Sequence, residues 1–198
     1  MEKTLLQKAI VFAAKRHGGD VRKGTNIPYI VHPIEVMKIA AGITDDEKVR
    51  AAAVLHDTLE DTGTRRKAIE RRFGSDVCNL VLAESENKRK GIPPEESWKI
   101  RKRETIEHIA DADRGAKIIC LADKLANMRD MSRDYAREGE DFWNNFNAPD
   151  DGKGTSGKKA NIGWYYRKIA DALKDELGDE PAWKELDMLV EKVFQNSN

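Results

Sequence analysis

The sequence predicts an all-α fold, and three observations support this prediction. Apolar residues recur every three or four positions along most of the chain, which is the spacing of one helix face. We find no stretch that alternates as a half-buried strand does, and no internal repeat. Prolines and glycines fall where helices begin and end. Because 198 residues is an ordinary size for one domain, we expect a single helical bundle of about 9–10 helices.

The first helices can be placed from their apolar faces and start signals. Ala9 and Phe12 share one face of the first helix. Pro33 suits the first turn of the second helix, where a missing N–H costs nothing. Thr44 is expected to cap the third helix in a capping box with Glu47. The third helix is predicted to continue without a break through residues 56–61.

The remaining helices follow from similar signals. A helix is expected over Thr64–Phe73, where Gly74 stops it, and Ser75 or Asp76 should cap the next one. The stretch Glu84–Gly91 is polar and has no period, which predicts a loop. Four longer helices are expected over about residues 93–110, 114–130, 161–177 and 181–194.

Residues 144–160 depart from the helical pattern. This segment is rich in Gly, Asn, Asp and Lys, and large aromatic residues flank it. Structureless loops longer than about 12–15 residues are uncommon in compact domains, and they tend to be functional lids or disordered segments. We therefore expect a mobile lid loop at 144–160, within one domain that covers residues 1–198.

Charge and composition exclude several classes of partner. The chain has 35 basic and 35 acidic residues, whereas proteins that bind a nucleic-acid polymer usually carry a basic surplus. No apolar run approaches the ~20 residues of a membrane span, and the N-terminus lacks the uncharged core of a secretory signal. Cys78 and Cys120 do not form a CxxC motif, which argues against a disulfide framework or a thiolate zinc site. These features predict a cytoplasmic protein and leave its oligomeric state open.

The strongest local motif is Leu-His-Asp-Thr-Leu-Glu-Asp-Thr at residues 55–62. On a continuous helix, His56 and Glu60 are stacked one turn apart, and so are Asp57 and Asp61. Burying several carboxylates without a cation is costly, so the pattern favours a metal ion. His and carboxylate ligands without thiolates suit Mn²⁺, Fe²⁺ or Mg²⁺ better than structural zinc. A lone His-Asp pair, by contrast, is more often an ordinary helix end.

Further motifs surround this one in a fixed order. The chain contains, between about Phe12 and Met131, the segments FAAKRH, VRKGTNIPYIVHPIEV, AAAVLHDTLEDT, AIERRFGSDV, RKRETIEHI and GAKIICLADKLANMRDM. In this order and spacing they resemble the HD-domain hydrolases of the RelA/SpoT alarmone family, and most of all its small stand-alone hydrolases. The resemblance implies that the helical bundle is a single HD domain and that the protein is an enzyme.

The resemblance also implies the roles of eleven residues. The family's metal ligands, which usually hold one Mn²⁺ ion although other divalent metals are possible, correspond to His32, His56, Asp57 and Asp123. The pair that orients and deprotonates the attacking water corresponds to Glu60 and Asp61. The substrate-binding positions correspond to Arg22, Lys23, Lys102, Asn127 and Tyr165.

The activity implied is that of a guanosine-3′,5′-bis(diphosphate) 3′-pyrophosphohydrolase-like, metal-dependent hydrolase. It would convert (p)ppGpp or a related alarmone, a small phosphorylated nucleotide, into GDP or GTP and pyrophosphate. The family's synthetase half is not expected, because the chain ends soon after the hydrolase region. Glu84-Ser85-Glu86 replaces the family's Thr-Asp, which leaves guanine or adenine recognition open. The alternatives are another nucleotide phosphohydrolase, acting on ppApp or on the ribose phosphate of a dinucleotide, and a non-catalytic alarmone-binding module.

The lid segment contains a GxxxxGK pattern from Gly152 to Lys158. A P-loop needs a preceding buried strand and a Ser or Thr where Lys159 stands, so we do not predict an NTPase. The loop is instead expected to cover the substrate, with Lys153, Lys158 and Lys159 near its phosphates.

Overall fold

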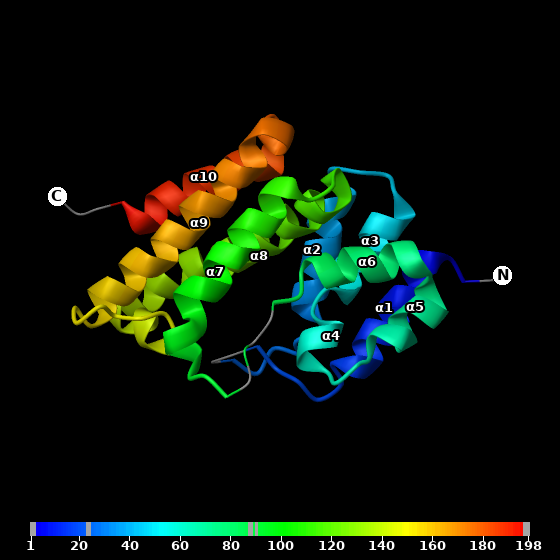
Figure 1. Cartoon of the computed structure of the whole chain (residues 1–198), viewed down its shortest axis with the longest axis horizontal. Coiled ribbons are helices and arrows are strands. Elements are labelled where there is room, and N and C mark those ends of the chain that lie inside the picture. Colours follow the sequence, from blue (N-terminus) through cyan, green and yellow to red (C-terminus); the bar gives the residue numbers. More distant parts are fainter. Residues whose placement is uncertain (1–2, 23–24, 87–88, 90, 196–198) are drawn as a thin grey trace. The chain divides into compact units, whose positions relative to one another are not determined.

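The structure is a computed structural model that describes residues 3–22, 25–86, 89 and 91–195. Within these ranges the regular structure is helical, with ten α-helices and one 3₁₀ helix (Figure 1), so the all-α prediction is confirmed. The backbone also forms one isolated antiparallel bridge, between Val21 and Pro28. The chain divides into two compact units, one formed by residues 1–85 and 112–126, the other by residues 86–111 and 127–198.

The first unit is built around a short, alanine-rich helix. Its helices are α1 (Leu5–Arg16), α2 (Val31–Ala41), α3 (Glu47–Leu55), α4 (Thr58–Asp61), α5 (Arg66–Phe73), α6 (Ser75–Ala83) and the beginning of α8 (Arg114–Glu138). Helix α3 packs against α1, α2 and α6. Ala51, Ala52 and Ala53 have no exposed surface, and such small side chains let neighbouring helices approach closely. The core of this unit therefore lies around α3.

Two helix starts differ from the sequence prediction. Helix α3 is capped by Asp46, whose carboxylate accepts a hydrogen bond from the N–H of Lys48 at 2.8 Å, so the predicted capping box of Thr44 is wrong. The Thr44 hydroxyl instead accepts from the N–H of Asp46. The N-cap of α6 is Gly74, at φ 89°, and not Ser75 or Asp76. At α3 two polar residues compete for one cap, and sequence spacing alone does not rank them. Helix α6 begins at Ser75 itself, so its N-cap position falls on Gly74, which has no side chain to form a cap.

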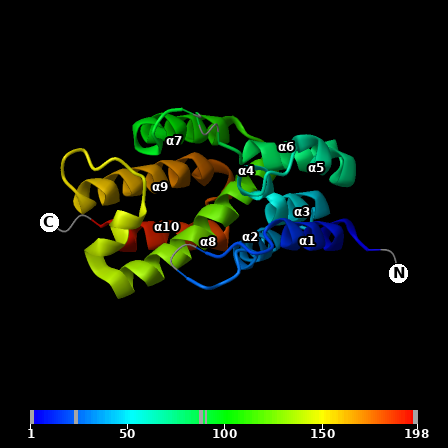
Figure 2. The same cartoon turned by 90° about the horizontal axis from the view of Figure 1, so that it is seen from below.

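The second unit consists of α7 (Pro94–Asp111), the rest of α8, a 3₁₀ helix, η1 (Gly139–Asn145), α9 (Thr155–Leu177) and α10 (Pro181–Phe194). Helix α9 packs against α7, η1 and α10, and Figure 2 shows α9 and α10 side by side. Trp143 has no exposed surface and contacts the rings of Tyr135, Phe142 and Phe194. These aromatic contacts form the centre of this unit.

The segment predicted as a loop at 144–160 is irregular only from residue 146 to residue 154, because α9 already begins at Thr155. The side-chain amide of Asn161 donates to the carbonyl of Pro149 at 2.8 Å and to the carboxylate of Asp151 at 2.9 Å. Asp151 also forms an ion pair with Lys99 at 2.9 Å. The irregular segment is therefore attached to both α7 and α9.

Two of the lysines expected near substrate phosphates have partners inside the second unit. The ammonium group of Lys158 donates to the carbonyl of Phe146 at 3.0 Å. The ammonium group of Lys159 lies 4.6 Å from the centre of the Tyr135 ring and donates to its hydroxyl at 2.8 Å. Both side chains therefore connect the start of α9 to the residues that pack against it.

The structure also bears on the sequence arguments about membrane spans and cysteines. Among the described helices, none combines the length and the apolar character that crossing a membrane requires. Cys78 and Cys120 are both buried and free of disulfide bonds.

Candidate functional site

The His56-Asp57 dipeptide lies at a break between two helices. Helix α3 ends at Leu55 and α4 begins at Thr58, so the predicted uninterrupted helix is wrong at this point. The break is small, because the N–H of Asp61 still donates to the carbonyl of Asp57 at 3.0 Å. The hydroxyl of Thr58 donates to the carbonyl of Leu55 at 2.7 Å. Asp57 and Asp61 thus remain one turn apart, as the sequence spacing predicts.

The four residues predicted as metal ligands come together in the first unit. Nε2 of His32, at the start of α2, lies 3.1 Å from Oδ1 of Asp123, on α8. Nε2 of His56 lies 3.0 Å from Oδ2 of Asp57. The two remaining His–Asp pairs, His32 with Asp57 and His56 with Asp123, are 3.6 Å apart. Two imidazole nitrogens and two carboxylate oxygens therefore face one another across one small space.

The hydrogen bonding of His56 suits a metal ligand. Its Nδ1 lies 2.8 Å from the carbonyl of Ala53, so the ring donates there, and Nε2 is the nitrogen that remains for a metal ion or for a second proton. Within the described residues, this buried Nε2 has no hydrogen-bond partner. A nitrogen lone pair that faces a carboxylate oxygen at 3.0 Å is repelled unless positive charge lies between them. The donor set therefore fits a divalent cation, and His with carboxylate oxygens is a common set for such ions.

The electrostatics of the cluster point the same way. Burial lowers the pKa of His56, but the carboxylates of Asp57 and Asp123 outweigh this and raise it well above its usual value. Burial raises the pKa of Asp57, yet the neighbouring histidines hold it below its usual value. The pKa of Asp123 is also lowered, because Lys124 and the two histidines outweigh burial. The cluster thus attracts positive charge strongly, and a metal ion would compete with protons for these groups.

Tyr29 contacts this cluster, although the sequence did not single it out. Its hydroxyl donates to Oδ2 of Asp57 at 2.6 Å and lies 3.4 Å from Oδ2 of Asp61. Burial and the nearby carboxylates raise the pKa of Tyr29 far above its usual value, so the phenol keeps its proton. An aromatic residue three positions before a histidine is easily read as core packing. Only the contact between distant segments reveals its polar role.

The predicted water-activating pair lies on α4. Glu60 is half-buried and Asp61 is exposed. Asp61 borders a hollow of about 420 Å³ that is also lined by His17, Gly19, Asp20, Val21 and Tyr29. The ring of His17 is buried and lies 4.8 Å from the ring of Tyr29. The structure therefore gives Asp61 both contact with Tyr29 and an adjoining open space.

The predicted substrate-binding residues are divided between the two units. In the first unit, the guanidinium group of Arg22 lies 5.6 Å from the centre of the Tyr29 ring. Lys23 lies outside the described residues. In the second unit, the Lys102 ammonium lies 4.7 Å from the centre of the Tyr165 ring. Asn127, half-buried on α8, belongs to the second unit as well.

Glu86 pairs with two basic residues of α7, Arg101 and Lys102, and the sequence did not predict this pairing. Its carboxylate accepts a hydrogen bond from Arg101 at 2.6 Å and also pairs with Lys102. Both contacts join the chain just after α6 to helix α7. The acidic residues of Glu84-Ser85-Glu86 are a sequence signal that could have indicated this pairing.

Glu84, at the end of α6, is a second acidic residue that the sequence did not identify. Burial raises its pKa from 4.5 to about 7, although Lys124 acts in the opposite direction. Its Oε1 is buried and, among the described residues, makes no hydrogen bond. The first unit therefore contains a carboxyl group that gains or loses a proton near neutral pH.

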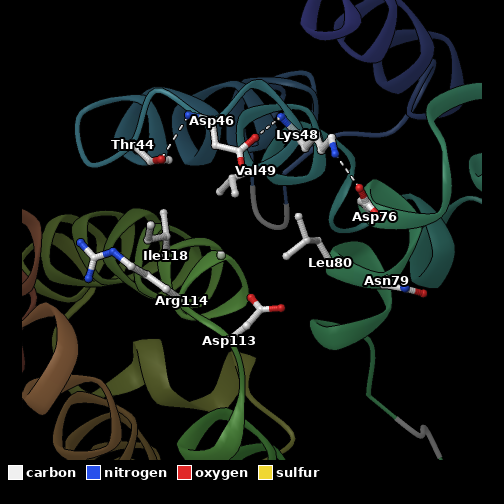
Figure 3. Close-up of a pocket in the computed structure, with 11 residues that line it drawn as sticks. Thr44, Asp46, Lys48, Val49, Asp76, Asn79, Leu80, Asp113, Arg114 and Ile118 are labelled. Carbon is white, nitrogen blue, oxygen red and sulfur yellow. Dashed lines mark hydrogen bonds and ion pairs between the residues drawn. The ribbon is translucent and has the colours of Figure 1, made fainter.

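A larger hollow of about 540 Å³ lies elsewhere in the first unit (Figure 3). Its lining includes Lys48 and Asp76, which form an ion pair at 2.5 Å, and both side chains are more than half exposed. None of the eleven predicted site residues lines it. Size alone therefore does not identify the functional site of this protein.

Comparisons with known proteins identify relatives of this chain. A family model described as "HD domain" matches residues 9–152. The guanosine-3′,5′-bis(diphosphate) 3′-pyrophosphohydrolase MESH1 of Xenopus tropicalis is 43% identical over 133 residues, which is 65% of this chain and 70% of that protein. MESH1 of Homo sapiens is 43% identical over 136 residues, which is 67% of this chain and 72% of that protein. A solved structure, described as a metazoan ortholog of SpoT that hydrolyzes ppGpp and plays a role in starvation responses, superposes with a TM-score of 0.70. It is 28% identical and covers 98% of this chain and 96% of its own.

Proposed function

The chain belongs to the HD-domain family and is related to the RelA/SpoT proteins, and from this membership we propose that it hydrolyses the 3′-pyrophosphate group of (p)ppGpp. The observation that carries the proposal is the cluster of His32, His56, Asp57 and Asp123, with Asp61 one turn beyond Asp57. This cluster provides the ligands of a hydrolytic metal site and a nearby base. The substrate is a small phosphorylated nucleotide.

The four clustered side chains would hold one divalent cation, for which we propose Mn²⁺. When bound, such an ion activates water and neutralises the charge that develops on a phosphoryl group. The protein's own contribution is to keep both imidazole Nε2 atoms directed at the carboxylates, and the bond from His56 to Ala53 does this for one ring. Burial of both histidines also limits competition from bulk water.

We assign the proton transfer to Glu60 and Asp61. The water oxygen bonds to the phosphorus that carries the ribose 3′-oxygen, and the bond between that phosphorus and the 3′-oxygen breaks. The carboxylate pair takes one proton from the water and returns it to the 3′-oxygen, while the other hydrogen remains on pyrophosphate. Atoms and charge then balance, and the products are GDP or GTP and pyrophosphate.

The substrate contacts are proposed from the resemblance, residue by residue. Arg22 and Lys23 provide positive charge and, for Arg22, a planar group beside the base. Lys102 provides a phosphate contact, Asn127 a hydrogen bond, and Tyr165 an aromatic face. Of these, Lys102 and Tyr165 already contact each other in the second unit.

The test is a product assay with ppGpp, ppApp and a dinucleotide that carries a ribose phosphate, each incubated with the protein and Mn²⁺. We expect ppGpp to yield GDP and pyrophosphate. The Asp57→Ala variant should lose turnover, whereas Asp175→Ala, which removes an exposed carboxylate from α9, should keep it. Release of orthophosphate in place of pyrophosphate, or unchanged turnover by Asp57→Ala, would overturn the proposal.

A further inference from the structure

We infer that Tyr29 is a positioning residue that joins the metal-ligand side of the site to the water-activating side through a single hydroxyl group. The hydroxyl lies 2.6 Å from Asp57 and 3.4 Å from Asp61. Its one proton is donated to Asp57, because a carboxylate oxygen can only accept, and Asp61 lies beside this bond as a second, more distant acceptor. The inference rests on the proposed function only for the role of Asp61, since the contact with Asp57 belongs to the cluster itself.

The oxygen that Tyr29 contacts is the one that matters for a cation. Oδ2 of Asp57 is the atom 3.0 Å from Nε2 of His56 and 3.6 Å from Nε2 of His32. Tyr29 therefore fixes the oxygen that faces both histidines, and not the outer oxygen of the carboxylate. A hydrogen bond to a metal ligand of this kind sets its orientation, and removing it typically costs about 10–100-fold in metal affinity or activity.

Tyr29 is itself held on several sides. Its ring packs on His17 at 4.8 Å and meets His32 edge-on at 5.9 Å, measured between ring centres. The guanidinium group of Arg22 lies 5.6 Å from the ring centre. Its backbone N–H donates to the carbonyl of Asp20 at 2.9 Å. Contacts with two histidines, a cation and the backbone leave the hydroxyl little freedom to turn away from the carboxylates.

A purely structural tyrosine would behave differently. Such a residue uses its hydroxyl to satisfy a buried polar group, and its loss lowers stability without changing metal binding. Tyr135 provides the comparison, because its hydroxyl donates to the carboxylate of Glu140 at 2.5 Å in the second unit. The same change, Tyr→Phe, can therefore be made at a carboxylate inside the site and at one outside it.

The experiment compares Tyr29→Phe with Tyr135→Phe in the full chain. Mn²⁺ affinity is measured by titration calorimetry, and kcat and KM for ppGpp are measured at saturating Mn²⁺. We expect Tyr29→Phe to weaken Mn²⁺ binding by about 10-fold or more and to lower kcat by a similar factor, with KM within about twofold. Tyr135→Phe should leave all three values unchanged. Equal Mn²⁺ affinities of the two variants would overturn the inference.

A measurement on the unmutated protein covers the case in which Tyr29→Phe does not fold. The protein has four tyrosines, which can be labelled with ¹³C at the ring carbon that bears the hydroxyl and assigned by substituting the other three. Mg²⁺ serves as a diamagnetic probe. The Tyr29 signal should shift on titration with Mg²⁺ while that of Tyr135 stays in place, and an unresponsive Tyr29 would overturn the inference. If the wild-type protein binds Mn²⁺ but does not hydrolyse ppGpp, the proposed function fails while the metal-binding arm still tests Tyr29.

Discussion

Nε2 of His56 lies 3.0 Å from Oδ2 of Asp57, and the hydrogen bond of the same ring to Ala53 leaves Nε2 to hold a proton or a metal ion. Two electron-rich atoms are thus held in contact by the backbone on one side and by Tyr29 on the other. The arrangement is stable only with positive charge between them, whether a proton or a metal ion. Metal binding by the protein is expected to depend on this contact.

The first expected property is metal-dependent stability. Mn²⁺ should raise the unfolding free energy by about 2.7 kcal/mol when its concentration is about 100 times Kd, because it binds only the folded protein tightly. His56→Ala should lose this stabilisation, and His108→Ala, which removes an exposed imidazole from α7, should retain it. Thermal unfolding with and without Mn²⁺ checks both. An equal response of the two variants would exclude His56 as a ligand.

A second expectation concerns pH and Glu84, whose pKa in the folded protein is raised from 4.5 to about 7 by burial. Below pH 4.5 the carboxyl is protonated in both the folded and the unfolded chain. As pH rises towards 7, the unfolded chain releases this proton and the folded protein keeps it, so stability is lost until the pH exceeds 7. The loss is at most roughly 3 kcal/mol.

Glu84→Gln should remove this loss. Compared with the wild type, the variant should therefore gain stability between pH 5 and pH 8 in urea unfolding of the metal-free protein. Glu70→Gln removes an exposed carboxylate from α5 and serves as the matched control. If the two variants show the same dependence on pH, the buried carboxyl does not titrate as described.

A third prediction concerns the attachment of segment 146–154. The side-chain amide of Asn161 makes hydrogen bonds to Pro149, Asp151 and Gly157, the last at 3.2 Å. Asn161→Ala leaves these acceptors without their donor, which should cost about 1–3 kcal/mol. Hydrogen exchange should accelerate at the amide of Lys153, which donates within this segment to Asp150. Asn144→Ala, at an exposed position of η1, should change neither quantity.

A fourth prediction concerns Gly157, in the first turns of α9. A Cβ atom there would lie 1.7 Å from the carbonyl oxygen of Asp150, which is a clash with backbone. Helix propensity alone predicts that Gly157→Ala stabilises the protein by about 1 kcal/mol. We expect Gly157→Ala to destabilise the protein instead, because segment 146–154, which contains Asp150, would have to move away from α9. Chemical denaturation decides between them, and a stabilised variant would show that Asp150 yields without cost.

The sequence predicted the long helices best. Proline start signals and the apolar period placed α10 at its observed bounds and α7 within about one residue of its bounds. It ended α8 near residue 130, whereas the helix continues to Glu138. It began α9 six residues late, because Gly157 reads as a loop signal. That glycine is instead required by the close approach of Asp150, a contact that no local pattern contains.

The sequence predicted which residues form the metal-ligand cluster. It did not predict the helix break at the cluster or the residues that contact it. The spacing of the HD motif and the resemblance together named the four residues that cluster. The break after Leu55 was not predicted, since His56 and Asp57 keep helical dihedral angles and only the hydrogen bonding changes. Tyr29 was missed because its role depends on Asp57, 28 residues away in sequence. Glu84 was missed because its pKa depends on burial, which a sequence does not report.

The alanine run that precedes His56 limits how this protein can change. Ala51, Ala52 and Ala53 have no exposed surface, and the carbonyl of Ala53 orients the first imidazole of the site. A larger side chain in this run would overpack the core by about 1–3 kcal/mol, and glycine would cost about 1 kcal/mol in helix propensity. Substitutions within this run therefore cost stability and also disturb the carbonyl that orients His56. Over many generations, Ala51, Ala52 and Ala53 should vary more slowly than the exposed residues at the start of the same helix.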